Sequence, residues 1–443
     1  MEITLTQLLD AREDRVRKQR KMQEENKCPL ICFTMNIAGP AKTSDAIKRA
    51  FNYGIASLDK KLEEFEIPSK KIEYPLSGPT AFYSVLGDAE TIKKLCVEIE
   101  ESCPLGRLFD MDVIDTSLQK IERHVQRRCI ICGKEGRSCA AGRVHSVQEL
   151  QNKTAKIIAE HFAVIDADII SRLGKKALIQ EVMTTPKPGL VDSDNSGSHT
   201  DMNLETFLKS ADAIHPYFKK CFDIGVDTTE LDPAKTFELL REEGLQAEKD
   251  MYLATNGINT HKGIIYSLGI IMGAIGRLWS TELNGISIEN ILKECARLVE
   301  VSTKNDLEKI DESTAGGRLY LTRGKAGIRG EVALGFPSIH NIGLPAYKNA
   351  INGGYNKNDA GVITLLHLIA NIYDSNLYNR GGNEGVLWAQ DYAKKLCGVP
   401  FTTDGIKKMD DDFIKKNLSP GGSADLLAIT YFLAELEDLT KKI

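Results

Sequence analysis

The spacing of apolar residues changes character partway along the chain. Two short apolar runs near the N-terminus, at residues 30–37 and 104–115, are rich in strand-forming side chains and are bounded by Gly and Pro. From residue 145 onward, apolar residues recur at helical spacing instead. The helices predicted from this spacing are 6–25, 45–66, 80–101, 145–183, 203–222, 233–254, 262–281, 287–308, 359–378, 384–397 and 423–441.

This change predicts two domains of different class. A chain of 443 residues is too long for a single compact core. Strand-like runs are confined to the first part, so we expect an α+β domain over residues 1–157. Helix follows helix after that point, so we expect an all-α helical bundle over residues 158–443. No linker separates the two, and the boundary is placed inside a predicted helix.

Composition narrows the class of protein. The formal net charge is -5, which argues against a nonspecific nucleic-acid binder. No run of eighteen apolar residues is present, so we expect no membrane span. The N-terminus is charged from its second residue and lacks the apolar core of a secretory signal. We therefore expect a cytoplasmic protein whose ten cysteines are reduced thiols.

Two aspartates on the second strand-like run suggest a metal-dependent transfer site. Asp110 and Asp112 are two residues apart, so on a strand both point to the same face, with Arg107 just upstream. Such a pair can hold Mg²⁺ against a triphosphate in nucleotidyl transfer, and we expect a nucleotidyltransferase-like fold here. A D-x-D motif alone is common by chance. Asp115, or a residue on a further strand at 121–125, is the third ligand, and spacing does not choose between them.

A cysteine-rich segment follows this strand. It has the form C-x2-C-x6-C-x5-H, from Cys129, Cys132 and Cys139 to His145. Four soft ligands of this kind could close a tetrahedral zinc site. The spacing fits no common zinc module, so we favour reduced cysteines in a small hairpin over a zinc site. The surrounding arginines make a basic patch suited to phosphates or to an acidic partner.

The loop at residues 185–202, TPKPGLVDSDNSGSHTDM, concentrates polar side chains that suit a binding site. Its Pro and Gly residues prevent a helix or a regular strand. Lys187, Asp192, His199 and Asp201 lie within it, a mixture that suits a cation and a phosphorylated substrate. The alternative is a polar surface loop of ordinary turn residues.

Further Gly-bounded polar loops separate the later helices. If they gather at one rim of the bundle, they build a pocket. As an alternative, each polar residue caps a helix or a turn. The polar residues of these loops are His261, Lys262, Arg329, Glu331, Asp374 and Asp425. Glu248 is expected to be partly buried on the helix at 233–254.

Several of these segments resemble two known families. TPKPGLVD, SHTDM, GINTHKG, GIRGE followed by GFP, and LSPGGSADLLA resemble motifs of triphosphoribosyl-dephospho-CoA synthase, in the same order, over about 165–435. LLDAREDR, FTMNIAGPAK, GRLFDMDVID and RRCIICGKEGRSCA with His145 resemble apo-citrate lyase phosphoribosyl-dephospho-CoA transferase, over roughly 5–150. The chain therefore resembles a fusion of the two families.

The resemblance implies two consecutive reactions. In the C-terminal domain, the 2′-hydroxyl of dephospho-CoA would displace adenine from ATP. The product would be 2′-(5″-triphosphoribosyl)-3′-dephospho-CoA. In the N-terminal domain, a serine of the apo acyl carrier (gamma) subunit of citrate lyase would attack the α-phosphate and release pyrophosphate. The expected partners are thus ATP, dephospho-CoA and the carrier subunit, with no nucleic acid and no membrane.

The resemblance also suggests roles for the polar residues. We expect Asp110 and Asp112 to be catalytic and to bind Mg²⁺, with Arg107 and Lys42 binding substrate. In the C-terminal domain we expect Mg²⁺ on Asp192, Asp201 and Asp374, and Glu248 or Asp425 as the base. The remaining substrate contacts are assigned to Lys187, His199, His261, Lys262, Arg329 and Glu331.

Two other functions remain open at this stage. The first is the same chemistry serving malonate decarboxylase, which an assay with each apo carrier protein would distinguish. The second is a noncatalytic scaffold that binds a carrier protein and uses the cysteines as a zinc knuckle. The scaffold predicts no release of adenine from ATP and dephospho-CoA.

Overall fold

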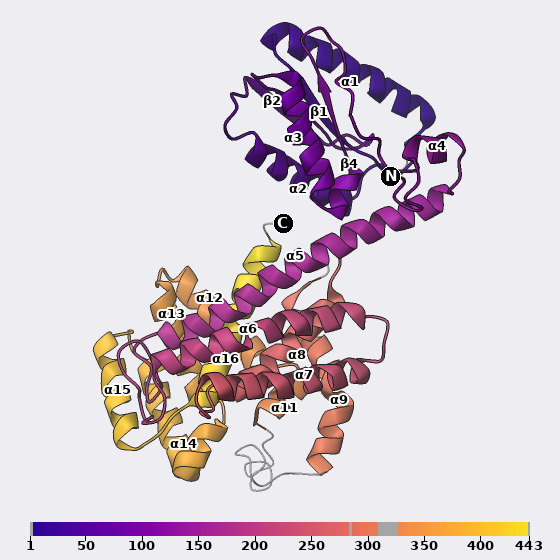
Figure 1. The fold of residues 1–443 in the computed structure, drawn as a ribbon. Coiled ribbons are helices and arrows are strands. Elements are labelled where there is room, and N and C mark those ends of the chain that lie inside the picture. Colours follow the sequence, from indigo (N-terminus) through magenta and orange to yellow (C-terminus); the bar gives the residue numbers. More distant parts are fainter. Residues whose placement is uncertain (1–2, 283–285, 309–326, 442–443) are drawn as a thin grey trace. The chain divides into compact units, whose positions relative to one another are not determined.

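The chain forms two compact units, Met1–Val164 and Ile165–Ile443, which are drawn in Figure 1. The structure is a computed structural model that describes residues 3–282, 286–308 and 327–441. The division between the units falls inside helix α5 (Val147–Met183). The boundary predicted near residue 157 lies in the same helix, and it stays a prediction.

The N-terminal unit is α+β, as predicted, and it contains a four-stranded antiparallel sheet in the order β2-β3-β1-β4. The strands are β1 (Leu30–Met35), β2 (Ser69–Glu73), β3 (Thr80–Ser84) and β4 (Phe109–Ile114). The helices are α1 (Leu5–Asn26), α2 (Asp45–Lys61), α3 (Ala89–Glu101), η1 (Pro104–Leu108) and α4 (Gly136–Ala141).

Three sequence predictions in this unit were wrong, the first being that residues 104–108, expected to begin a strand, form the 3-10 helix η1. Residues 80–84, predicted as helix, form strand β3, which is buried at all five positions and so shows no alternation of polar and apolar residues. The further strand expected at 121–125 is not present: these residues are irregular, and only Lys120 just before them forms a single bridge, with Ile114.

The two faces of the sheet are covered by different helices. On one face, Phe33 stacks on Phe51 of α2 with ring centroids 4.7 Å apart. Gly54 allows this approach, since an added Cβ would lie 2.5 Å from the Phe33 ring. On the other face, Met22 of α1 packs with Cys32 and other apolar residues of β1 and β3. This leaves β4, at the edge of the sheet, with room for polar side chains.

In the C-terminal unit, every element that the structure describes is helical. The helices after α5 are α6 (Leu204–Asp227), α7 (Pro233–Ala254), α8 (Lys262–Leu278), α9 (Ile288–Glu308), α11 (Gly327–Ala333), η2 (Ile339–Gly343), α12 (Leu344–Asn352), α13 (Lys357–Asn371), α14 (Ser375–Cys397), α15 (Thr403–Lys415) and α16 (Gly421–Thr440). The sequence analysis missed α11, α12 and α15. It also extended α13 too far, since Asp374 caps the start of α14.

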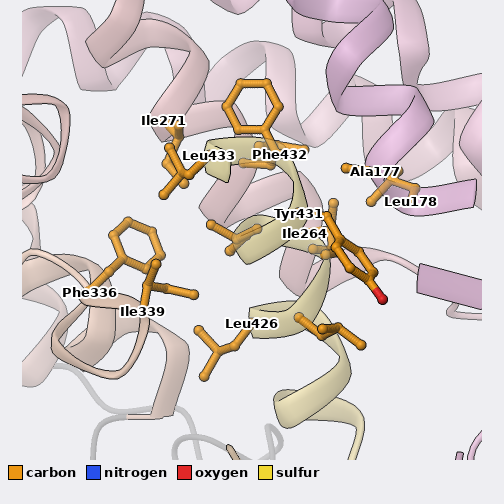
Figure 2. Close-up of a cluster of buried hydrophobic side chains, with 14 of the residues drawn as sticks. Ala177, Leu178, Ile264, Ile271, Phe336, Ile339, Leu426, Tyr431, Phe432 and Leu433 are labelled. Atoms are coloured by element: carbon orange, nitrogen blue, oxygen red, sulfur yellow. The ribbon is translucent and has the colours of Figure 1, made fainter. Parts of the chain in front are cut away.

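Two apolar helices, α8 and α16, form the centre of this unit. Almost every residue of α8 from Ile264 to Arg277 is buried, as expected for a helix that is apolar on all sides. Figure 2 shows side chains of α16 packed together with those of α5, α8, η2 and the residues just before η2. The labelled residues are Ala177, Leu178, Ile264, Ile271, Phe336, Ile339, Leu426, Tyr431, Phe432 and Leu433. This packing fixes the N-terminal ends of α8 and α16, which carry predicted site residues.

Two further observations concern the setting of the protein. No helix within the described ranges combines the length and the apolar character needed to cross a membrane. All ten cysteines are free thiols in the structure.

Two candidate active sites

Strand β4 places Asp110 and Asp112 in a cavity of about 790 Å³ in the N-terminal unit. Burial alternates along the strand, with Phe109, Met111 and Val113 in the core and the aspartates between them. The pairing of Asp112 with Cys32 of β1 puts both aspartates on the α1 side of the sheet. The predicted shared face of the two carboxylates is therefore confirmed.

Both carboxylates are neutralised by cations from the irregular segment after β4. Lys120 Nζ lies 2.6 Å from Asp112 Oδ1, and Arg127 lies 3.5 Å from Asp110 Oδ1. Asp115, proposed as a third ligand, instead accepts hydrogen bonds from the backbone N–H groups of Ser117 and Gln119. Its carboxylate stabilises a turn, so the structure gives no support to a metal role for Asp115.

Glu100 of α3 is a residue of this site that the sequence analysis missed. It is only 2% exposed, and its Oε1 accepts a hydrogen bond of 2.8 Å from the backbone N–H of Met111. The same carboxylate pairs with Arg127 and, at 3.4 Å, with Arg123. Burial raises the pKa of Glu100, while the charge of Arg127 lowers it. Glu100 thus joins the open edge of β4 to the segment that carries the arginines.

The two other predicted substrate ligands of this unit are placed differently. Arg107 lines the cavity and donates a hydrogen bond to the backbone carbonyl of Arg128. Lys42 is not among the residues that line it, and its ammonium donates to the carbonyl of Ile37. Burial, together with the charge of Arg12, lowers the pKa of Lys42. The structure therefore brings Arg107 to the aspartates and leaves Lys42 apart from them.

The cysteine segment lines the same cavity. Cys129, Cys139 and His145 are among the lining residues. The ligand atoms of these three residues and of Cys132 all lie within 4.8 Å of one another. The simple hairpin favoured from spacing did not predict this convergence.

In the C-terminal unit, the loop at 185–202 is organised by Asp192, which is 2% exposed. Its Oδ2 accepts hydrogen bonds from Thr185 Oγ1 and Lys187 N, and its Oδ1 accepts from Asp194 N and Asn195 N, all at 2.8–2.9 Å. A carboxylate offers about four lone-pair sites. All of them are used by the loop, so the hydrogen bonding disfavours the predicted role of Asp192 as a metal ligand.

Asp374 is used in the same way at another junction. Its Oδ1 accepts from the backbone N–H groups of Asn376 and Leu377 at the start of α14. Its Oδ2 accepts from the N–H and the hydroxyl of Ser423 at the start of α16. Asp374 therefore holds two helix N-termini together, and this arrangement also disfavours a metal role.

Asp425 differs from these two aspartates. It lies on the first turn of α16 against the first turn of α8, where a Cβ added to Gly263 would be 2.1 Å from Asp425 Oδ2. Among the described residues, no hydrogen bond or ion pair involves its carboxylate. Burial, with the negative charges of Glu181 and Asp374, holds the pKa of Asp425 well above its usual range. Its surroundings therefore favour the protonated, neutral form of this carboxyl.

A buried ion pair lies beside Asp425. Lys187, 1% exposed, places its Nζ 2.5 Å from Oε1 of Glu181, which is on α5 and 5% exposed. Burial raises the pKa of Glu181, and Lys187 partly offsets this. The sequence analysis found Lys187 but missed Glu181, because a single acidic residue on a long helix resembles a solvated one.

His261 and His199 occupy two further positions in this unit. His261, 4% exposed, shares a 2.7 Å hydrogen bond through Nδ1 with Ser210, and burial with the charge of Lys187 lowers its pKa to about 3. His199 Nε2 lies 2.9 Å from Ser419 Oγ. Asp201 is exposed, and its Oδ1 is 3.8 Å from His199 Nδ1. Both imidazoles are oriented by hydroxyl groups, and His261 is kept uncharged by burial.

The last predicted residues lie around the start of α8 and on α11. Lys262 Nζ pairs with Glu248 Oε2 at 2.9 Å, which raises the pKa of Lys262. The charge of Arg329 lowers that pKa slightly, so Arg329 lies near this pair. Glu331 accepts hydrogen bonds from the N–H and hydroxyl of Ser338. Residues 309–326, which precede Arg329 and Glu331 in the chain, lie outside the described residues.

The predicted Mg²⁺ ligands of the C-terminal unit are not assembled into a metal site. Among the side chains of residues 3–282, 286–302 and 327–441, the cysteine and histidine cluster is the only group of three or more metal-ligating side chains that converges. A cavity of about 590 Å³ beside α12 and α13 contains none of the predicted residues.

Two family profiles match separate stretches of this chain. The profile of the CitG family, ATP:dephospho-CoA triphosphoribosyl transferase, matches residues 167–443. The profile of the CitX family, apo-citrate lyase phosphoribosyl-dephospho-CoA transferase, matches residues 3–161.

Three relatives are similar over long stretches. A protein named CitXG from Leuconostoc mesenteroides subsp. cremoris is 33% identical, over 98% of this chain and 97% of its own length. A protein of the same name from Haemophilus influenzae is 35% identical, over 97% and 96%. A 2-(5''-triphosphoribosyl)-3'-dephosphocoenzyme-A synthase from Pectobacterium atrosepticum is 40% identical, over 62% of this chain and 90% of its own length.

Proposed function

This chain belongs to the CitXG family, and we propose that its two units carry out consecutive reactions on one prosthetic-group precursor. The protein is a bifunctional transferase, which combines triphosphoribosyl-dephospho-CoA synthase with apo-citrate lyase phosphoribosyl-dephospho-CoA transferase. ATP and dephospho-CoA are its substrates. The division of labour among residues is the part that we propose here.

The C-terminal unit carries out the first reaction, a glycosyl transfer. The 2′-hydroxyl oxygen of dephospho-CoA forms a bond to C1 of the ATP ribose while the bond from that carbon to adenine breaks. The hydroxyl proton is lost and adenine gains one, so the reaction needs a group that moves protons next to the ribose. Developing positive charge on the ribose also needs stabilisation by nearby negative groups.

Asp425 is the residue that we assign to proton transfer. Its pKa is held well above the usual range, its carboxylate has no other partner among the described residues, and it lies near the start of α16 against the start of α8. Glu248 was the alternative base. Its carboxylate is paired with Lys262 at 2.9 Å, which supports a role in holding that lysine instead. Lys262 and Arg329 are then placed to bind phosphate groups beside the start of α8, where backbone N–H groups favour anions.

The N-terminal unit carries out the second reaction. A serine hydroxyl of the citrate lyase acyl carrier subunit forms a bond to the α-phosphorus of the intermediate, and the bond to pyrophosphate breaks. The observation that supports this assignment is the cavity that holds Asp110, Asp112, Arg107 and Arg127 together. The arginines and Lys120 supply positive charge for the departing pyrophosphate. Because the nucleophile belongs to the carrier, the unit needs no activated serine of its own.

Asp110 and Asp112 also fit a divalent cation. Mg²⁺ takes hard oxygen ligands and is held in many enzymes by one or two carboxylates together with substrate phosphates. Both carboxylates face the cavity, and their partners in the structure are cations, which a metal ion can replace. When bound there, Mg²⁺ would neutralise the triphosphate. In the C-terminal unit, Asp192, Asp201 and Asp374 do not make an equivalent site in the structure.

A product analysis tests the proposal. Full-length protein is incubated with ATP and dephospho-CoA, with and without the apo carrier subunit, and the products are identified by mass spectrometry. We expect adenine and the triphosphoribosyl intermediate without carrier, and pyrophosphate with a modified serine when carrier is added. The apo carrier of malonate decarboxylase is the matched control. Modification of that carrier alone would contradict the assignment to citrate lyase.

A further inference from the structure

We propose that Cys129, Cys132, Cys139 and His145 form a structural zinc site in the N-terminal unit. The site is separate from the pair of aspartates and from the reactions described above. The spacing of these residues in the sequence does not favour a zinc site, whereas the positions of their side chains do.

The positions of the four side chains carry this inference. Their ligand atoms all lie within 4.8 Å of one another, and the Sγ atoms of Cys132 and Cys139 are 3.4 Å apart. Tetrahedral zinc with Zn–S bonds of about 2.3 Å requires sulfur atoms about 3.8 Å apart. Only small shifts are needed to place an ion at the centre. Three thiols and an imidazole are soft ligands that suit zinc and do not suit Mg²⁺.

The backbone is arranged to bring the first two cysteines together. The chain turns after Cys132, where the N–H of Gly133 donates to the carbonyl of Cys129 at 3.0 Å. Gly133 has a φ of 70°, a left-handed conformation that glycine adopts without strain. The N–H of Cys129 in turn donates to the carbonyl of Lys134 at 2.7 Å. This compact turn makes Cys129 and Cys132 two adjacent ligands.

The other two ligands come from α4 and the turn that follows it. Cys139 lies on α4, and the N–H of Val144 donates back to its carbonyl at 3.1 Å. This return places His145 next to the cysteines. The Nε2 atom of His145 is buried and has no hydrogen-bond partner among the described residues. An unsatisfied buried nitrogen is costly, and binding of a metal by the imidazole would offset that cost.

The segment has almost no buried core of its own. Of residues 115–146, all of which the structure describes, Cys139 alone is buried. Ordering this many residues costs free energy that a single buried side chain cannot offset. Small segments without a core are usually held by disulfides or by metal ions. A zinc ion bound by the four side chains would supply this stabilisation.

Two alternatives explain less. A disulfide between Cys132 and Cys139 would use two of the four residues and leave Cys129 and His145 unexplained. Three independent thiols beside a free imidazole would leave the unpaired nitrogen of His145 and the absence of a core unexplained.

The site would also position the wall of the cavity. Arg127 and Arg128 directly precede Cys129, and Arg127 reaches both Glu100 and Asp110. Arg107 donates to the backbone carbonyl of Arg128. We therefore infer that the ion acts as a positioning element for these arginines. This second step rests on the proposed function of the N-terminal unit, whereas the metal site itself does not.

Metal analysis of the full-length protein tests the site. We expect about one zinc per chain in protein purified without chelator. In Cys132→Ser the zinc content should fall at least about tenfold. The matched control is Cys103→Ser, a thiol of the same unit outside the cluster, which should keep its zinc. The proposal would be overturned if wild-type protein contained as little zinc as Cys132→Ser and also failed to take up cobalt.

Cobalt titration gives a readout that does not depend on a variant folding correctly. Wild-type protein stripped of metal and titrated with Co²⁺ should develop the d–d and thiolate charge-transfer absorption of tetrahedral cobalt, saturating at about one equivalent. Zinc should then displace this absorption. No such bands in wild-type protein, or a Cys132–Cys139 disulfide found by peptide mass analysis, would overturn the site.

Carrier loading separates the metal site from its positioning role. Stripped protein supplied with the triphosphoribosyl intermediate should load the carrier at least about tenfold more slowly, with most of the change in kcat, and readdition of zinc should restore the rate. Adenine release should be unchanged. Unaltered loading by stripped protein that takes up one cobalt would disprove the positioning role and leave the site standing.

Discussion

The two units hold the carboxylates that were predicted as site residues in opposite ways. In the N-terminal unit, Asp110 and Asp112 line a cavity and meet cationic side chains that a substrate complex can displace. In the C-terminal unit, Asp192 and Asp374 are buried, and loop or helix donors fill both oxygens of each. The contrast shows that the hydrogen bonds of an aspartate, and not its place in a motif, decide whether it is available for chemistry.

The largest effect is expected from Asp112→Asn. Loss of one carboxylate from the pair removes a ligand for the cation and should reduce carrier loading on the order of 10⁴-fold. Adenine release should not change, because that reaction uses the other unit. Loading is measured as pyrophosphate release from supplied intermediate. A folded Asp112→Asn protein that also lost adenine release would contradict the assignment of separate sites.

Asp425→Asn is the reciprocal change and sharpens the comparison within the C-terminal unit. Removal of a positioned proton-transfer group should slow adenine release by about 10³-fold while sparing loading from supplied intermediate.

Asp192→Asn is the matched variant. The amide keeps an oxygen that can accept some of the loop hydrogen bonds, but it places an N–H group where the loop needs an acceptor. We expect adenine release to fall in that variant together with the order of the loop, measured as faster proteolysis between residues 185 and 202. Equal loss in both variants with an intact loop would mean that Asp192 acts directly.

The buried ion pair offers a test of stability. Lys187→Met leaves Glu181 buried without its partner, which should destabilise the C-terminal unit by about 3–5 kcal/mol. Both tryptophans of the chain, Trp279 and Trp388, lie in this unit, so their fluorescence during denaturant unfolding follows it selectively.

The double variant Glu181→Gln/Lys187→Met removes both charges and should recover much of that loss. Lys293→Met, which breaks an exposed pair with Glu289, is the control and should leave the unfolding midpoint in place. If Lys187→Met behaved like Lys293→Met, the pair would not be as deeply buried as the structure places it.

The fold was predictable where polarity alternates and less so where it does not. Strand β4 was found because Asp110 and Asp112 alternate with buried apolar residues. Strand β3 was predicted as helix because its side chains are buried on both faces of the sheet, so its sequence shows no alternation of polar and apolar residues. The short helices α11 and α12, of seven and nine residues, escaped detection because they span too few turns for a periodicity to stand out. Helix α15, which has thirteen residues, was missed although its length and spacing are those of an ordinary amphipathic helix.

The sites were predictable only in part, for a physical reason. Motif residues in Gly- and Pro-rich loops were found, since such loops carry function. Glu100 and Glu181 were missed because each lies on a helix, where a lone acid resembles a solvated residue. Their burial depends on Arg127 and Lys187, which reach them only in the folded chain. The convergence of three cysteines with His145 is likewise a property of the fold.

The smallest effect, and the one that probes burial most directly, is the pH dependence of stability. Burial lowers the pKa of His261 to about 3 in the folded chain, against an ordinary value of 6.5. Between these values the unfolded chain binds a proton that the folded chain does not, so this residue makes the free energy of unfolding fall as pH falls from 6.5.

His261→Gln should therefore reduce the pH slope of that free energy by up to about 1.4 kcal/mol per pH unit between pH 4.5 and 6. Tryptophan fluorescence again reports on the C-terminal unit. His124→Gln, at a side chain that is 82% exposed in the N-terminal unit, is the control and should leave the slope unchanged. An unchanged slope in His261→Gln would show that the imidazole is accessible to water, and the C-terminal site would then be as open as the cavity around Asp110 and Asp112.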